Sequence, residues 1–505
     1  MKRIVPATMV TQHPDNANKP YWHSDVFINT QYEANECFMS YNDLGACDYN
    51  WDWEGKYVDE SVIEKLYSEH YDFFKKNQVG KDIFLTFRLP NPEVETEFRI
   101  GRAFMGILSA SQLADKIGMY NPPLFEVILP MTENADQMLA VQEAFREMAT
   151  LEHRLFNLKQ ETLKHLEIIP LFEEVNIIMD VDKILGKYFK EHKKKFGFLP
   201  ENMRVYVARS DPALNAGIIP TVLAVKIALS KFRSISEENG IPLYPMLGAA
   251  VLPFRGGISP DTVEDFTNEY KGISTTTIQS AFRYDFPIEN VKKAISKLKE
   301  ILPKNKAVLI NSNDERELRK LILASEKFYK STIENIANTI NAVAAFVPKR
   351  RERVQHIGLF GYSRGIGAVK LPRAITFTAS LYSVGVPPEL IGTGRTIKFA
   401  IENGFIEVLE KNYINLKKDL IKAGKYLNKE NLDILCEDNE VWKQVREDVK
   451  CLEEYLGQEL KPQCVEDREH LLLTLKILDR IRNQKNQDEI HDLITLTAKL
   501  RKSIG

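Results

Sequence analysis

Short apolar runs rich in β-branched residues alternate with longer amphipathic stretches over most of the chain. Read as strands, these runs predict eight elements, at residues 4–10, 82–88, 124–130, 167–172, 203–208, 241–247, 272–278 and 355–360. Leu, Ile, Glu and Lys recur at spacings of three and four in the stretches between them, which is typical of amphipathic helices. The clearest helical stretches are 61–77, 133–166, 178–194, 218–235 and 314–346.

This alternation predicts right-handed βαβ units around a parallel sheet. Eight strands favour a closed (β/α)8 barrel of the TIM type, although a doubly wound sheet fits the periodicity almost as well. The barrel region, 1–385, is longer than the roughly 250 residues of a typical barrel, a difference that insertions commonly explain. Beyond Pro387 and Pro388 the pattern is almost entirely helical and shows no linker-like composition. We therefore expect residues 386–505 to form a helical region packed on the barrel.

Composition and charge narrow the function classes. The chain has 505 residues, 44% of them hydrophobic and 27% charged, and a net charge of −2. A near-neutral chain lacks the basic surface of a general nucleic-acid binder. The five cysteines are odd in number and show no CxxC spacing, which is typical of reduced thiols in the cytoplasm. No apolar run approaches the roughly 18 residues of a membrane span, and MKRIVPATMV lacks the apolar segment of a signal peptide.

Polar side chains follow every predicted strand. In chain order they are His13; Arg88; Thr132 and Glu133; Glu173 and Glu174; Arg209, Ser210 and Asp211; Arg255, Gly256 and Gly257; Gln279 and Arg283; and Gly361, Tyr362, Ser363 and Arg364. In a barrel these positions converge on the carboxyl-terminal face, where the active site lies. The sequence therefore predicts a polar site at that face.

The residue types at these ends favour a small polyanion and a hard metal ion. Planar guanidinium groups suit carboxylate and phosphate oxygens, and five arginines lie on candidate loops: Arg88, Arg255, Arg283, Arg364 and Arg373. Glu173 and Asp211 follow neighbouring strands and suit Mg2+ or Mn2+. Gly256 and Gly257 could let backbone amides approach an anion. No GxxxxGK[ST] loop is present, so we expect no nucleotide.

Each of these residues also has a structural interpretation. His13, between Gln12 and Pro14, is by itself most simply a turn residue. Glu173 could be an acid favoured in the first turn of a helix, and Asp211 could cap a helix that begins with Pro212. A single strand-end arginine is usually part of a surface ion pair. Their occurrence together, at the ends of eight predicted strands, favours a site.

Specific motifs occur from end to end of the chain: TQHPDN, FLTFRLPNPEVE, PLFEE, ARSDPALNAG, PFRGGISP, FRYDF, GYSRG, LPRAITFTASLYSVGVPPELIGTGR and a terminal glycine. In these motifs the chain resembles the archaeal-type, short form of phosphoenolpyruvate carboxylase. The resemblance implies a barrel with many extra helices, typically a homotetramer. It also implies irreversible, anaplerotic conversion of phosphoenolpyruvate and bicarbonate into oxaloacetate and phosphate with Mg2+ or Mn2+. No AMKM-type segment is present, so we expect no biotin.

Carried over by position, the resemblance assigns roles to individual residues. It implies His13, Arg255 and Arg364 as catalytic residues and Glu173 and Asp211 as metal ligands. The substrate-binding positions that it implies are Arg88, Arg373, Gly256, Gly257 and, by a weaker match, Arg283.

The chain departs from the longer bacterial and plant enzymes in its loops. Leu214 stands where they have a lysine, the stretch of Pro253 and Phe254 where they have a histidine, and no second arginine follows Gly257. These departures bear on the arginine-loop chemistry and on allosteric control.

The implied mechanism proceeds through carboxyphosphate and a metal-stabilised enolate, with His13 assisting the decomposition of carboxyphosphate. Two other functions remain open at this point. One is a different metal-dependent barrel, such as a mutase or lyase acting on phosphoenolpyruvate or a related 2-oxo acid. The other is a helical scaffold without enzymatic activity, which leaves the strand-end charges unexplained.

Overall fold

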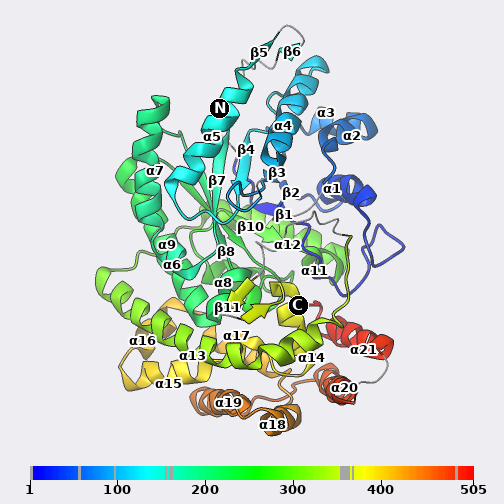
Figure 1. The fold of residues 1–505 in the computed structure, drawn as a ribbon, viewed down its shortest axis with the longest axis vertical. Coiled ribbons are helices and arrows are strands. Elements are labelled where there is room, and N and C mark those ends of the chain that lie inside the picture. Colours follow the sequence, from blue (N-terminus) through cyan, green and yellow to red (C-terminus); the bar gives the residue numbers. More distant parts are fainter. Residues whose placement is uncertain are drawn as a thin grey trace.

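Eight parallel strands close into a barrel at the centre of the molecule (Figure 1). The computed structural model describes residues 4–54, 58–95, 98–153, 156–157, 163–352, 364–366, 369–483 and 487–505. Around the barrel the strands follow the order β1–β10–β9–β8–β7–β4–β3–β2. Their bounds are β1 (Thr8–Val10), β2 (Asp48–Asp52), β3 (Phe84–Arg88), β4 (Glu126–Leu129), β7 (Glu167–Phe172), β8 (Met203–Ala208), β9 (Leu243–Gly248) and β10 (Thr275–Ile278). The predicted (β/α)8 barrel is confirmed.

Seven barrel strands fall on predicted runs, and the eighth does not. That strand is β2, with the sequence DYNWD, which the apolar-run criterion missed. The run predicted at 355–360 lies outside the described residues, and the barrel closes without it because β2 pairs with both β1 and β3. The prediction failed because Asp48, Asn50 and Asp52 interrupt the apolar character of β2, although all three side chains are buried.

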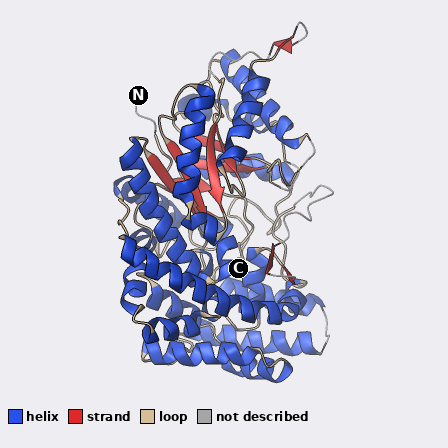
Figure 2. Cartoon of the chain, turned by 60° about the vertical axis from the view of Figure 1, so that its left-hand side comes forward, coloured by secondary structure: helices blue, strands red, loops and turns tan. Residues whose placement is uncertain are grey.

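In the described part of the chain, twelve α-helices precede the long connecting helix α13. They are α1 (Glu33–Asn42), α2 (Val62–Glu69), α3 (Tyr71–Lys76), α4 (Arg99–Lys116), α5 (Ala135–Ala149), α6 (Val175–Met179), α7 (Val181–Phe196), α8 (Ser210–Ala216), α9 (Ile218–Asn239), α10 (Val263–Glu269), α11 (Ser280–Tyr284) and α12 (Ile288–Ile301). Helices surround the strands in both ribbon views (Figure 2). No helix in the described part of the chain is long and apolar enough to cross a bilayer.

The helix predicted at 133–166 is too long. Helix α5 ends at Ala149, the last residue of its buried face, and Leu151 is exposed. A short antiparallel pair of strands follows, β5 (Glu152–His153) and β6 (Phe156–Asn157), before the chain enters β7. The helix predicted at 61–77 is likewise divided, because α2 ends before His70 and α3 begins after it.

The remaining helices pack beside the barrel at the lower end of Figure 1. They are α13 (Ser312–Ala344), α14 (Ala374–Ser383), α15 (Thr393–Glu402), α16 (Ile406–Asn412), α17 (Leu416–Gly424), α18 (Lys429–Asp438), α19 (Trp442–Leu456), α20 (Val465–Arg482) and α21 (Gln487–Leu500). Helix α13 contacts α9 on the barrel side and α15 on the other. One hydrophobic core contains residues of both regions, including Phe254 and Leu420. The boundary at residue 385 stays a prediction.

The barrel interior is apolar in the middle and charged at its amino-terminal end. Met9, Ile128 and Tyr206 belong to a small buried cluster distinct from the main core. Below it, Arg204 Nη1 lies 2.9 Å from Asp48 Oδ2 and 3.1 Å from Glu126 Oε2. Because all three side chains are buried, this ion cluster closes the end of the barrel opposite His13.

Candidate active site

A cavity of about 90 Å³ lies at the carboxyl-terminal ends of the barrel strands. Its lining residues come from the ends of β1, β3, β8 and β10, from the loops after β2 and β9, and from the start of α14. They are His13, Glu54, Arg88, Ser210, Asp211, Arg255, Gln279, Arg373, Ala374 and Ile375. The structure thus brings together His13, Asp211 and three of the five predicted arginines.

His13 stands three residues beyond the end of β1 and is half-buried. Its ring is oriented by Thr11, whose Oγ1 lies 2.9 Å from Nδ1. Its backbone oxygen accepts hydrogen bonds from the Asp15 amide at 3.1 Å and from the Ser280 amide at 3.4 Å. Main chain and imidazole are therefore both held by neighbours, which is what a positioned acid–base group requires.

Arg88, the last residue of β3, is held by two carboxylates. Its Nε and Nη2 each lie 2.8 Å from an oxygen of Asp52, and its Nη1 lies 2.7 Å from Glu54 Oε2. Burial opposes the charge of Arg88, but Asp52 and Glu54 raise the pKa of its guanidinium well above the usual value. A guanidinium has five N–H groups, so these contacts use three of them. Arg88 is thus a fixed cation at the cavity wall.

Sequence reasoning missed Asp52 and Glu54 together with strand β2. A usable signal was present in DYNWDWE, where acids and amides at 48, 50, 52 and 54 alternate with aromatic residues at 49, 51 and 53. Such period-two alternation is typical of a strand with two different faces. Asp48 contacts Arg204, and Asp52 and Glu54 contact Arg88, while the aromatic residues lie in the main core.

Glu173 and Asp211 follow neighbouring barrel strands, β7 and β8, as predicted. Glu173 follows β7 directly, and its Oε2 accepts a hydrogen bond of 2.8 Å from the Met131 amide. Asp211 lies in the first turn of α8, just after β8, and lines the cavity. The charge of Glu173 acts on Arg88 and that of Asp211 acts on Arg255, which puts both carboxylates beside the cavity's cations.

The donor set of this site fits a hard divalent ion held partly by water and substrate. Mg2+ usually takes one or two protein carboxylates and completes its octahedron with other oxygens. Among the described residues, no group of three or more His, Cys, Asp or Glu side chains is arranged to hold a metal. Two oxygen donors that follow adjacent strands, Glu173 and Asp211, therefore suit Mg2+ or Mn2+ better than a zinc site closed by protein ligands.

Arg255 forms polar contacts with four other segments of the chain at the cavity wall. Its side chain is buried; Nε donates to Ser210 Oγ at 3.1 Å, and Nη2 donates to Gln279 Oε1 at 2.6 Å. Its Nη1 lies 3.3 Å from Asp15 Oδ2 and also donates to the backbone oxygen of Gly505. Burial lowers the pKa of Arg255. Any anion that binds here meets a cation already fixed by neutral and acidic partners.

Gly256 and Gly257 form the tight turn after Arg255 and do not line this cavity. Both have positive φ, +119° and +77°, which favours glycine. Their amides donate within the loop, to the carbonyl oxygens of Pro253 and Leu252, each at 3.0 Å. In this structure the glycines thus shape the arginine loop, and their amides are not directed at the cavity.

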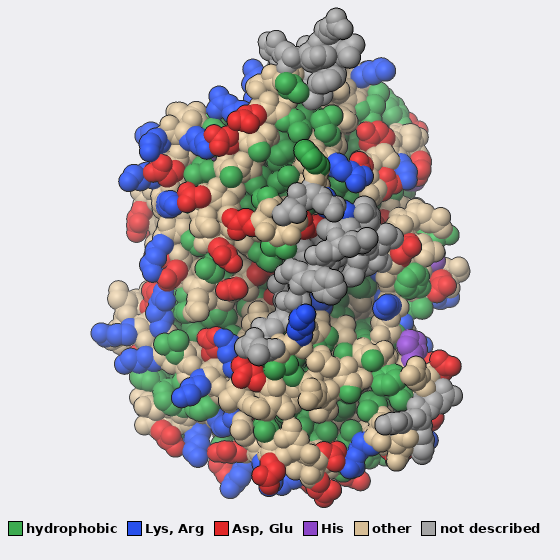
Figure 3. All heavy atoms as spheres, in the orientation of Figure 1, with side chains coloured by type: hydrophobic (Ala, Val, Ile, Leu, Met, Phe, Trp, Pro, Cys, Tyr) green, Lys and Arg blue, Asp and Glu red, His purple; other side chains and the backbone are tan. Residues whose placement is uncertain are grey.

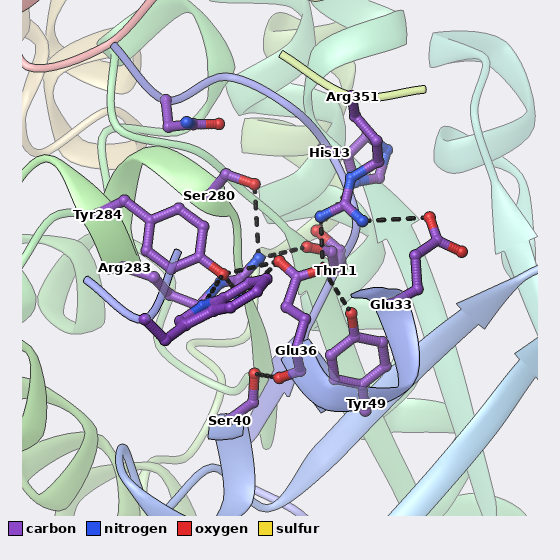
Figure 4. A network of polar contacts seen from close by, with 12 residues as sticks. Thr11, His13, Glu33, Glu36, Ser40, Tyr49, Ser280, Arg283, Tyr284 and Arg351 are labelled. Carbon is purple, nitrogen blue, oxygen red and sulfur yellow. Dashed lines mark hydrogen bonds and ion pairs between the residues drawn. The ribbon is translucent and has the colours of Figure 1, made fainter. Parts of the chain in front are cut away.

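The other predicted arginines occupy three different settings. Arg373 precedes α14 and lines the cavity. Arg283 is buried and does not line the cavity; it donates to Glu36, to the Tyr284 hydroxyl and to the backbone oxygen of Thr11 (Figure 4). Arg364 begins strand β11 (Arg364–Ile366), which pairs with β12 (Val369–Leu371), and its side chain lies outside what the structure describes, as do Gly361, Tyr362 and Ser363.

On the face seen in Figure 3, Lys and Arg side chains are interspersed with Asp and Glu side chains. Inside the barrel mouth, by contrast, three arginines line one cavity: Arg88, Arg255 and Arg373.

Comparison with known proteins gives a consistent answer along the whole chain. The family model described as phosphoenolpyruvate carboxylase matches residues 5–505. A phosphoenolpyruvate carboxylase of Leuconostoc mesenteroides is 40% identical, with 94% of each chain covered. A phosphoenolpyruvate carboxylase of Metallosphaera sedula is 38% identical over the full length of both chains. One of Methanothermobacter thermautotrophicus is 37% identical, with 99% of this chain and 100% of the relative covered. The chain therefore belongs to the phosphoenolpyruvate carboxylase family.

Proposed function

We propose that this chain carboxylates phosphoenolpyruvate with bicarbonate and releases oxaloacetate and phosphate. The observation that carries the proposal is the cavity at the barrel mouth, where His13, Asp211, Arg88, Arg255 and Arg373 meet. Three guanidiniums suit a substrate that carries both a phosphate and a carboxylate. Family membership agrees with the same reaction.

The arginines would hold the substrate and offset its charge so that a second anion can approach. A bicarbonate oxygen attacks phosphorus, the bond from phosphorus to the enol oxygen breaks, and the products are carboxyphosphate and the enolate of pyruvate. Such phosphoryl transfer depends on positioning and charge stabilisation more than on covalent help from the protein. Arg88 and Arg255 suit this task because their partners already fix them.

His13 would act in the second half of the reaction. It takes the carboxyl proton of carboxyphosphate while the C–O bond to phosphate breaks, and the proton then passes to the departing phosphate. The enolate carbon attacks the resulting CO2 and forms the new C–C bond. The cavity must exclude water at this stage, because water would protonate the enolate to pyruvate.

Glu173 and Asp211 would hold Mg2+ or Mn2+. When bound, the ion supplies Lewis-acid stabilisation of negative charge on the substrate's oxygens. On the resemblance, Arg364 is proposed as a catalytic residue, and Gly256 and Gly257 are proposed to shape the loop that carries Arg255. A homotetrameric state, a cytoplasmic location and an anaplerotic role are also proposed on the resemblance alone.

The test is a coupled oxaloacetate assay with phosphoenolpyruvate, bicarbonate and Mg2+ or Mn2+. We expect oxaloacetate to form only when all three are present. A mutase or lyase acting on the same substrate would turn over without bicarbonate, and a scaffold would not turn over at all. Either result would refute the proposal. Light scattering of the purified protein tests the tetramer.

A further inference from the structure

A buried carboxylate on α1, Glu36, is the centre of a network of polar contacts beneath the candidate site (Figure 4). Its Oε1 accepts from the Tyr284 hydroxyl at 2.7 Å and from Arg283 Nη1 at 3.1 Å. Its Oε2 accepts from the Tyr49 hydroxyl at 3.1 Å and from Arg351 Nη2. Four donors from β2, α11 and the segment around Arg351 therefore converge on one side chain that is 0% exposed.

Arg283 links this network to His13. Besides Glu36, its guanidinium donates through Nη2 to the backbone oxygen of Thr11 at 3.1 Å. The Thr11 side chain in turn contacts the His13 ring, with Oγ1 2.9 Å from Nδ1. The path from Glu36 to the imidazole thus contains two residues, Arg283 and Thr11, and each contact in it is a hydrogen bond.

Arg351 holds the other oxygen of the Glu36 carboxylate. It pairs with Glu33 at 3.1 Å and with Glu36, and it forms an isolated parallel bridge with Ile28. Glu36 therefore joins α1 to the described segment around Arg351 that follows α13.

The charges of the network are sequestered from water. Each of four charged side chains is at most 1% exposed, namely those of Glu33, Glu36, Arg283 and Arg351. Burial alone would raise the pKa of Glu36, but Arg351 and Arg283 outweigh it and lower that pKa to about 2. A buried ion pair is weak support for stability, because an apolar set of similar volume is often as stable. What the ionised carboxylate adds is direction, since it fixes where two guanidiniums point.

We propose that Glu36 is a positioning residue that, through Arg283 and Thr11, sets the imidazole of His13 for its step on carboxyphosphate. Glu36 touches no lining residue of the cavity in these contacts, so its effect is exerted through the network. The inference rests on the proposed function. It concerns the second half of that reaction, in which His13 acts after phosphoryl transfer.

The test measures phosphate and oxaloacetate separately in the full-length protein. For the wild type we expect one oxaloacetate per phosphate released. In Glu36→Gln a misplaced imidazole should lower oxaloacetate formation on the order of 10- to 100-fold. Phosphate release should fall less, so the ratio of phosphate to oxaloacetate rises severalfold. The KM for phosphoenolpyruvate should change less than twofold, because Arg88 and Arg373 lie outside the network.

Glu33→Gln is the matched control. Glu33 lies on the same helix, is equally buried and pairs with Arg351, but no contact joins it to Arg283. It should lower thermal stability without raising the ratio of phosphate to oxaloacetate. If both variants give the same ratio, the network is merely structural and the proposal fails.

Tyr284→Phe keeps the proposal testable if Glu36→Gln does not fold. That change removes one hydroxyl, which donates to Glu36 and accepts from Arg283 at 2.6 Å, and leaves every charge in place. We expect a smaller rise of the same ratio, and an unchanged ratio in a folded Tyr284→Phe would overturn the inference. A wild type that forms no bicarbonate-dependent oxaloacetate would instead refute the proposed function, so the two failures are distinguishable.

Discussion

Gly505 occupies a position at which even one additional carbon atom cannot be accommodated. A Cβ on this residue would lie 2.1 Å from the backbone oxygen of Ile375 and 2.7 Å from the amide of Ala379, both in α14. Helix backbone cannot yield as a flexible side chain would, so in Gly505→Ala the residue itself must withdraw. The backbone oxygen of Gly505 accepts a hydrogen bond from Arg255, and its withdrawal frees that guanidinium from one of its fixed partners.

The size of the effect follows from the distances. Restoring normal contact from 2.1 Å requires a shift of about 1 Å, and a misplacement of that size at a catalytic group costs on the order of 10²-fold in rate. We expect kcat for oxaloacetate formation to fall by about that factor in Gly505→Ala. The melting temperature should stay nearly constant because the barrel core is untouched.

The coupled oxaloacetate assay across a range of phosphoenolpyruvate concentrations measures this loss. Ser503→Ala is the control, because it removes a hydroxyl with only long contacts, 3.4 Å to the Asp15 backbone oxygen and 3.3 Å to that of Gly505, and adds no atom. A Gly505→Ala protein with kcat within threefold of the wild type would show that Arg255 does not depend on this contact.

Four further results are expected. His13→Asn should abolish oxaloacetate formation and leave slow, bicarbonate-dependent phosphate release; full carboxylation by this variant would exclude the assigned role. Glu173→Ala and Asp211→Ala should each raise the metal concentration for half-maximal activity by on the order of tenfold or more, and an unchanged metal titration would remove them from the metal site. Arg204→Leu leaves Asp48 and Glu126 buried without their cation and should cost about 3–5 kcal/mol in urea unfolding, whereas a loss below about 1 kcal/mol would contradict the ion cluster. Burial lowers the pKa of His165 to about 4 in the folded protein, whereas a histidine in the unfolded chain has a pKa near 6.5. Between about pH 6.5 and 4 the unfolded chain therefore binds more protons than the folded chain, and the fold loses stability as the pH falls. The melting temperature should drop across that window, and less steeply in His165→Gln; parallel pH profiles would refute the assignment.

The barrel was predictable because its strands are short apolar runs with helical periodicity between them. Strand β2 escaped this criterion because its acids, Asp48 and Asp52, pair with Arg204 and Arg88, which are distant in sequence. Tertiary ion pairing makes such residues compatible with a buried strand, and no count of apolar residues records it. The alternation with Tyr49, Trp51 and Trp53 was the only local sign.

The candidate site was predictable to the extent that strand ends converge. His13, Arg88, Asp211 and Arg255 meet because parallel strands present their carboxyl ends on one face. Arg283 also follows a strand, yet it turns into the buried network of Glu36 and away from the cavity. Sequence position fixes the face on which a side chain begins, but the direction it takes depends on partners such as Glu36, which the chain supplies 247 residues earlier.

The contact between Ile504 and the loop after β1 determines when, during synthesis, the candidate active site can be completed. The Ile504 amide donates to the Asp15 backbone oxygen at 2.7 Å, so two segments separated by almost the whole chain complete the barrel mouth together. At roughly 5–20 residues per second, a ribosome needs about 25–100 s to travel from one to the other. All barrel strands, the last of which ends at Ile278, are thus synthesised well before Gly505, whose backbone oxygen accepts the hydrogen bond from Arg255. The contacts of Arg255 are then completed only once residues 503–505 have been made, and removal of those three residues should lower activity in a molecule whose barrel remains folded.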